Sequence, residues 1–254
     1  MKSNLMISML LVSSLVACDG GIFASDPVPL SALESSGSVS SGSANPATPD
    51  AVSPELPPAE TFVDAVANAY LPLTPGTFWI YEGTSDGEPR RDEVRVMEDT
   101  REIDGVDCTA VLQQVFLGGH PAEVTTEWFA QDADGNVWKF GEESLEWNGT
   151  EFIATEDSWV AGVGGAQPWI VMGADPEVGD VYIGNDGGGE ERLVIVAGAV
   201  QVEVPAGVFA NCVQVHENPD DEEDADMIIY GPGVGLVSEE SPEGRIELMA
   251  FGHE

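Results

Sequence analysis

The feature that most constrains the fold is a long succession of short strand-like segments separated by turns. Apolar and polar residues alternate in 93–96 and 200–204, and residues 193–196 form an apolar run typical of a strand buried on both faces. Turn-forming pairs such as Asp104-Gly105 and Asn148-Gly149 separate these segments at short intervals. Strands joined by tight turns pair antiparallel, so the pattern predicts a mainly β fold.

One helical pattern precedes the strands. Phe62, Val66 and Tyr70 fall on one face of a helix over 60–70, and prolines follow it. No helical period of ten or more residues occurs after it, which argues against a parallel sheet with crossover helices. We therefore expect a short N-terminal helix and then an antiparallel meander forming one curled sheet, a half-barrel or a sandwich.

The N-terminus has the features of a bacterial lipoprotein signal. A basic residue and a short apolar run lead to Leu15-Val16-Ala17-Cys18, which resembles the lipobox, and the apolar run is too short to span a bilayer. We predict a signal peptide over 1–17 and acylation of Cys18, which would anchor the chain to a membrane through its lipid. The alternative is an uncleaved helix with an incidental cysteine. The prediction places the protein in the bacterial cell envelope, periplasmic or surface-exposed, and leaves open which membrane holds it.

The amino-acid composition divides the chain after the signal peptide into two parts. Residues 18–58 are rich in Ser, Pro, Ala and Gly without hydrophobic periodicity, which predicts a disordered tether, and 59–254 form the predicted β domain. The chain carries 46 acidic residues against 8 Lys and Arg, a net charge of −38. This balance excludes a nucleic-acid-binding protein, which needs clustered basic residues. The excess of acidic residues indicates either adaptation to salt or loose binding of divalent cations.

Two acidic segments are candidate Ca²⁺ ligands. Asp132 and Asp134 open a segment that resembles a calcium loop, although Asp-Gly and Gly-Asn pairs also form hairpin turns, which the strand-like flanks favour. The densest acidic run either binds a hard cation or is a solvated loop, and its candidate ligands are Asp220, Asp221, Glu222, Glu223 and Asp224. No other cofactor is indicated.

Cys108 and Cys212 remain after Cys18 is lipidated. In an exported domain we expect them to form a disulfide; the alternative is two unpaired thiols in separate strands. No zinc-hydrolase, thiol-redox or nucleophile-elbow motif occurs, so the sequence identifies no catalytic residue. The six tryptophans either pack in the sheet or line a ligand-binding face.

Several segments, in order from about residue 70 to 240, resemble an uncharacterised family of bacterial secreted proteins and lipoproteins. The most specific are WFAQDADGNVW at 128–138, where the family usually has Tyr in place of Phe129, and GPGVGLV at 231–237. The resemblance implies an antiparallel β fold and no known reaction.

These features predict a lipid-anchored extracytoplasmic β protein. We expect it to bind a ligand or an envelope protein without catalysis, its only membrane contact being the lipid on Cys18. The alternatives are an acidic Ca²⁺-binding surface protein and an envelope hydrolase that uses carboxylates. A tether that holds a domain away from the membrane with wide reach suits capture or assembly.

Overall fold

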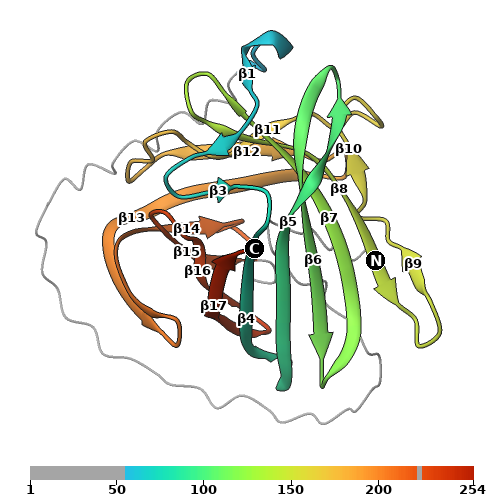
Figure 1. Cartoon of the computed structure of the whole chain (residues 1–254), viewed down its shortest axis with the longest axis vertical. Helices are drawn as coiled ribbons and strands as arrows, with labels where there is room; N and C mark the ends of the chain where they lie inside the picture. The colour runs from blue at the N-terminus through green and yellow to red at the C-terminus, as the bar shows by residue number, and fades with distance from the viewer. Residues whose placement is uncertain (1–54, 222–224) are drawn as a thin grey trace, which may run out of the picture.

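The computed structural model describes residues 55–221 and 225–254. The predicted signal peptide, Cys18 and nearly all of the tether lie outside these residues. The described part is almost entirely β-structure, with 17 strands and one turn of 3-10 helix, Ala59–Thr61 (Figure 1). None of its helical structure is long and apolar enough to cross a membrane.

The strands follow one another closely along the chain, as the spacing of the turn residues predicts. In order they are β1 (Phe62–Val63), β2 (Val66–Ala67), β3 (Pro72–Leu73), β4 (Thr77–Ser85), β5 (Glu88–Ile103), β6 (Val106–Leu117), β7 (His120–Asp132), β8 (Val137–Trp147), β9 (Phe152–Ala154), β10 (Trp159–Val160), β11 (Trp169–Met172), β12 (Val181–Asn185), β13 (Glu190–Val204), β14 (Gly207–Glu217), β15 (Asp226–Gly231), β16 (Gly235–Ser241) and β17 (Gly244–His253).

Fifteen strands form one antiparallel sheet, which confirms the predicted fold class. Its main path runs β10-β8-β7-β6-β5-β4-β17-β16-β15-β14-β13-β12, with β1 paired to β7 and both β9 and β11 paired to β8. Two meanders, β4 to β8 and β12 to β17, are thus joined where β17 pairs with β4. The sheet curls strongly but stays open (Figure 1).

The two edge regions of the curled sheet meet along a line that we call the seam. There β11 and β12 lie side by side. The backbone next to β11 is linked to the end of β12 by one isolated bridge, in which the Gln167 N–H donates to the Asn185 carbonyl at 3.0 Å.

The expected helix over 60–70 is wrong. After the 3-10 turn the chain is extended, with β1 paired to β7 and β2 paired to β3. Asn68 fixes the turn between β2 and β3, since its Oδ1 accepts from the Tyr70 N–H at 2.8 Å and its Nδ2 donates to the Gly173 carbonyl at 2.9 Å. The apolar residues of this segment enter the interior of the curl instead of lying on a helical face; they are Val66, Leu71 and Leu73.

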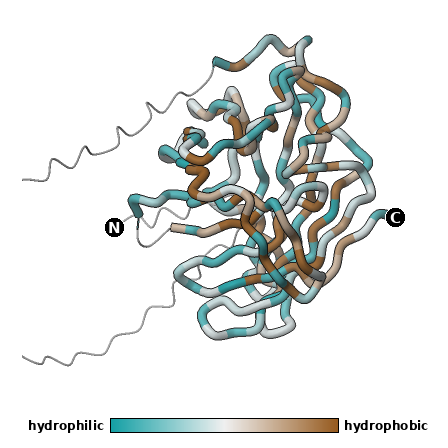
Figure 2. The backbone as a smooth tube through the Cα atoms, turned by 90° about the vertical axis from the view of Figure 1, so that its left-hand side faces the viewer, coloured by the Kyte–Doolittle hydropathy of each residue, from teal (hydrophilic) through white to brown (hydrophobic). Residues whose placement is uncertain are grey.

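Apolar side chains form two clusters, one on each face of the sheet. The interior cluster fills the concave side, where β3 lies across the curl (Figure 1), and includes Trp79, Tyr81 and Phe129. The outer cluster covers the convex side of β5 to β8, and the Phe62 ring meets Phe140 edge-on at 5.5 Å. Hydrophobic and hydrophilic residues alternate along the strands accordingly (Figure 2).

The β4–β17 junction requires a glycine at position 83. A Cβ on Gly83 would lie 1.8 Å from the backbone oxygen of Arg245 on β17, far inside van der Waals contact. We expect Gly83→Ala to lower the free energy of unfolding by about 1–3 kcal/mol, because the strand pair must separate to admit the methyl group. Urea denaturation of the full-length chain measures this.

Gly198→Ala is the matched control, since a Cβ there meets only Val178 Cγ2 at 3.7 Å, an ordinary contact. Equal stability of the two variants would contradict this account of the junction.

Candidate functional site

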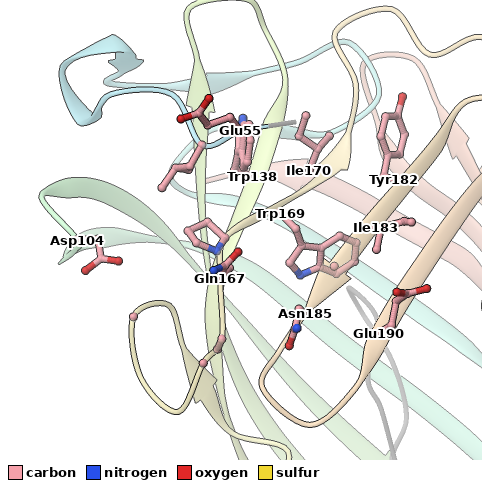
Figure 3. Close-up of a pocket in the computed structure, with 16 residues that line it drawn as sticks. Glu55, Asp104, Trp138, Gln167, Trp169, Ile170, Tyr182, Ile183, Asn185 and Glu190 are labelled. Carbon is pink, nitrogen blue, oxygen red and sulfur yellow. The ribbon is translucent and has the colours of Figure 1, made fainter. Parts of the chain in front are cut away.

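A pocket with a volume of about 900 Å³ opens at the seam (Figure 3). Residues from β8, β11 and β12 line it, together with the loop before β11 and the chain at Glu55, where the described part begins. We call it the seam pocket. Its size is within the range of pockets that hold small organic ligands.

The inner wall of the seam pocket is aromatic. Trp138 and Trp169 are 2% and 6% exposed, and they extend from the neighbouring strands β8 and β11. The indole of Trp169 lies against the backbone of Gly184 on β12, where a Cβ would approach its Cδ2 to 2.4 Å. Glycine at this position therefore lets the tryptophan fill the space beside β12.

One hydrogen-bonding group of this wall is unsatisfied. No described residue accepts a hydrogen bond from the buried Nε1–H of Trp169. By contrast, the Nε1–H of Trp138 donates to Asp132 Oδ2 at 2.8 Å. A buried donor without an acceptor costs free energy, so the wall favours a bound group that supplies an acceptor oxygen.

The outer rim of the seam pocket is polar and acidic. It carries the amide side chains of Gln167 and Asn185 and the exposed carboxylates of Glu55, Asp104 and Glu190. None of the described residues that line the pocket is Lys, Arg or His. The rim can therefore accept hydrogen bonds and attract positive charge, whereas it repels anions.

Tyr182 adds a hydroxyl to the same wall. It donates to Asp180 Oδ2 at 3.3 Å. Burial and the adjacent Asp180 charge raise the pKa of Tyr182, so the hydroxyl stays protonated. The lining residues include no serine, cysteine or histidine, and the wall offers hydrogen-bonding groups without a nucleophile and base for acyl transfer.

A second unusual region is the polar interior, the half of the concave face that continues from the interior apolar cluster. Its charged members lie on the same faces of the strands as that cluster: Asp92 is two residues from Val94, and Glu127 is two residues from Phe129. All are at most 7% exposed; they are Arg90, Asp92, Glu123, Glu127, Lys139, Glu142, Glu191, Glu217, Asp226 and Glu239.

The two basic groups of the polar interior are each held by carboxylates. Lys139 Nζ lies 2.7 Å from both Glu127 Oε1 and Glu142 Oε2, whose residues face each other on β7 and β8. Arg90 makes a two-pronged contact with Asp92, with Nε–Oδ1 at 2.8 Å and Nη2–Oδ2 at 2.6 Å.

These pairs do not fully stabilise ionised carboxylates. Burial raises the pKa of Glu142 to about 8; Lys139 offsets part of the effect, and the charge on Glu127 adds to it. Burial also raises the pKa of Asp92 despite the adjacent Arg90 guanidinium. One lysine shared by two buried carboxylates favours a proton on one of them.

The structure gives Asp132 a structural role in the β7–β8 hairpin. Its carboxylate accepts hydrogen bonds from the Asn136 N–H and Nδ2 at 2.9 Å and from Trp138 Nε1 at 2.8 Å. Asp134 is exposed in the same turn. This arrangement is the hairpin turn that the sequence favoured over a calcium loop.

The predicted acidic run is not assembled into a site in the described residues. Asp220 forms an ion pair with Arg192 at 2.5 Å, Asp221 is exposed, and Glu222, Glu223 and Asp224 lie outside the described residues. Across the described ranges, no group of three or more His, Cys, Asp or Glu side chains is arranged to hold a metal ion.

The predicted Cys108–Cys212 disulfide is wrong: both residues are free, buried thiols. Cys108 lies on β6 in the outer cluster, and Cys212 lies on β14, with β5, β4, β17, β16 and β15 between these strands in the sheet. Burial raises the pKa of Cys108 to about 12, so this thiol is unreactive in the folded domain.

No protein family matches the chain, and comparisons with curated proteins and solved structures found no significant match. The resemblance to secreted bacterial proteins therefore stays a prediction.

The cysteine arrangement is tested with the full-length Cys18→Ser chain, in which only Cys108 and Cys212 can react. Both are 0% exposed. We expect a thiol reagent to modify neither in the folded state and both after unfolding without reductant. A chain that becomes reactive only after reduction would contain the disulfide and contradict the structure.

Proposed function

We propose that the chain is a lipid-anchored protein of the bacterial cell envelope whose β domain binds a small polar ligand in the seam pocket without catalysis. The lipid on Cys18 and the tether over 18–58 would hold the domain near a membrane and give it wide reach. The observation that carries the proposal is the seam pocket, with its aromatic inner wall and polar rim.

The chemistry of the pocket suggests the class of ligand. Trp169 offers an unsatisfied donor on the inner wall, whereas the rim carboxylates and amides accept hydrogen bonds from hydroxyl or ammonium groups. A neutral or amine-bearing polyhydroxyl compound, such as a sugar or amino sugar, meets both requirements. Phosphorylated or sulfated compounds do not, since no base in the lining offsets their charge.

The two alternative functions have less support. An envelope hydrolase needs a closely paired acid and base that reach substrate, but the paired carboxyls Glu127 and Glu142 are held by Lys139 and are at most 2% exposed. The carboxylates that do reach the seam pocket lie on its outer rim. A Ca²⁺-binding surface protein needs converging free oxygens, whereas the oxygens of Asp132 already accept hydrogen bonds within the hairpin.

Ligand binding is tested by thermal unfolding of the full-length chain with three sets of probes: neutral oligosaccharides, amino-sugar oligomers and sugar phosphates. A probe that binds the folded state stabilises it by RT ln(1 + [L]/Kd), so the melting temperature rises as the probe concentration exceeds Kd. We expect a rise with members of the first two sets and none with the sugar phosphates. A preference for the phosphates would contradict the proposed charge selection.

Gln167→Trp locates the binding. The larger side chain would occupy the rim of the seam pocket, and we expect it to abolish the stabilisation by any active probe. Gln201→Trp makes the same change at an exposed position of β13 outside the pocket lining and should leave the stabilisation intact. Equal responses in both variants would place binding elsewhere.

The anchor is tested separately. We expect Cys18→Ala to release the protein from the membrane fraction or to halt processing of its precursor, because the acylated cysteine would be lost. Fractionation with immunodetection distinguishes these results from a mature variant that stays membrane-bound, which would refute lipid anchoring.

A further inference from the structure

The charge balance of the polar interior has a physical consequence that is independent of the seam pocket. In the described part of the chain this region encloses eight acidic side chains, Asp92, Glu123, Glu127, Glu142, Glu191, Glu217, Asp226 and Glu239, against two basic ones, Arg90 and Lys139. With full ionisation, the negative charges inside the curled sheet would exceed the positive ones by six. Burying an ionised carboxylate without a compensating charge costs several kcal/mol, and such groups take up protons instead.

Directly opposed carboxyls increase the free-energy cost of ionising this region. Glu127 faces Glu142 across β7 and β8, and Glu217 faces Asp226 across β14 and β15. Like charges at opposed positions of an antiparallel pair destabilise the sheet. A proton on one member of a pair removes the repulsion and supplies a hydrogen-bond donor.

The carboxyl group of Glu239 is buried without a full set of hydrogen-bond partners. It is 2% exposed, and its Oε2 has no hydrogen-bond partner among the described residues. Its cross-strand neighbours, Ile228 on β15 and Ile246 on β17, are apolar and buried. An ionised carboxylate in this position would lack a donor at Oε2, which a buried anion requires.

The titratable groups around Glu239 do not supply that compensation. From β5 it faces Arg90, which is committed to Asp92 at 2.6 Å, and Asp92 itself. From β15 it faces Asp226 and Tyr230, and from β4 Tyr81. Ile246 of β17 is apolar, and the positive charge that faces Glu239 is the Arg90 guanidinium, which is shared with Asp92.

We propose that the polar interior is a proton-binding site in which Glu239 carries a proton at neutral pH, and that loss of its protons in alkaline solution loosens the curled sheet. Burial outweighs the attraction of Arg90 and raises the pKa of Glu239 well above its ordinary value. Glu142 is the second proton-bearing group. The device lies within the sheet and acts whether or not the seam pocket holds a ligand.

The sign of the pH effect follows from proton linkage. The folded domain keeps protons that the unfolded chain releases above about pH 4.5, the ordinary pKa of glutamic acid. Their contribution to stability is complete below that pH and falls as pH rises; for Glu142 the loss is complete above about pH 8. When the folded state holds one proton that the unfolded chain has released, each unit of rise in pH increases the unfolding equilibrium constant about tenfold, as long as the pH stays below the pKa of the folded state.

The test is urea denaturation of the full-length chain at several pH values between 6 and 8. Glu239→Gln keeps the shape of a neutral carboxyl but cannot ionise, so it should remove one proton from the linkage. We expect the unfolding constant of this variant to rise less between pH 6 and 8 than that of the unmodified chain, by up to about a hundredfold for one proton over two pH units. Glu240→Gln, an exposed neighbour, should leave the pH dependence unchanged.

The salt dependence distinguishes proton binding in the interior from repulsion among surface acidic residues. High ionic strength screens exposed charges much more than buried ones, so the difference between Glu239→Gln and Glu240→Gln should persist in concentrated NaCl. If the difference disappears there, or if both variants match the unmodified chain, the proposal is wrong.

Infrared spectroscopy gives a readout that a merely structural role would not change. At neutral pH the unmodified chain should show the C=O stretch of a protonated carboxyl, and Glu239→Gln should lose part of that band. If Glu239→Gln fails to fold, Glu142→Gln replaces it, with its exposed neighbour Glu143→Gln as the control. Absence of the band from the unmodified chain would overturn the proposal.

A bound cation is the competing way to neutralise the interior. Proton binding predicts the same pH dependence after EDTA treatment and in CaCl₂ or NaCl of matched ionic strength. If Ca²⁺ abolishes the pH dependence and EDTA destabilises the chain, a cation and not a proton neutralises the carboxyls.

Discussion

The pairing of β17 with β4 is the constraint on which the rest of the structure depends. Each meander can form from contacts that are local in sequence, whereas this junction unites strands at opposite ends of the described domain. It turns the concave faces of the two meanders toward each other. The polar interior is a direct result, since Arg90 and Asp92 come from one meander and Glu239 from the other.

The sequence predicted the fold class because alternation and turn chemistry are local signals. The helix over 60–70 failed because the apolar spacing of Val66 and Tyr70 also suits short extended segments, and the decisive contact, from Asn68 to the distant Gly173 carbonyl, is tertiary. The disulfide failed for a related reason: the number of cysteines does not show that five strands lie between Cys108 and Cys212.

The candidate sites were less predictable than the fold. The aromatic wall of the seam pocket had a signal in the tryptophans, but nothing local indicated that Trp138 and Trp169 would line one pocket or that Trp169 would lie against Gly184. The polar interior had a readable signal. In 123–129, acidic residues occupy the same alternate positions as buried Phe129, so a curled sheet that buries one must bury the others.

The pocket and the polar interior share a boundary. Trp169 on β11 is paired directly with Lys139 on β8, so the indole wall of the pocket stands beside the lysine that holds two buried carboxyls. Glu190 lines the pocket, while the next residue, Glu191, belongs to the polar interior. The aromatic wall of the pocket therefore adjoins a region of very different polarity along this pair of strands.

The seam also determines the mechanical character of the domain. The long strands are joined by ladders of backbone hydrogen bonds, whereas in the described part of the chain the seam has one isolated backbone bridge, at Gln167 and Asn185, and the packing of Trp169 against Gly184. Widening the curl at this point would strain that bridge and the packing of Trp169, but it would leave the ladders of both meanders intact. Compliance is thus concentrated in the wall of the pocket, and the remainder of the sheet is stiffer.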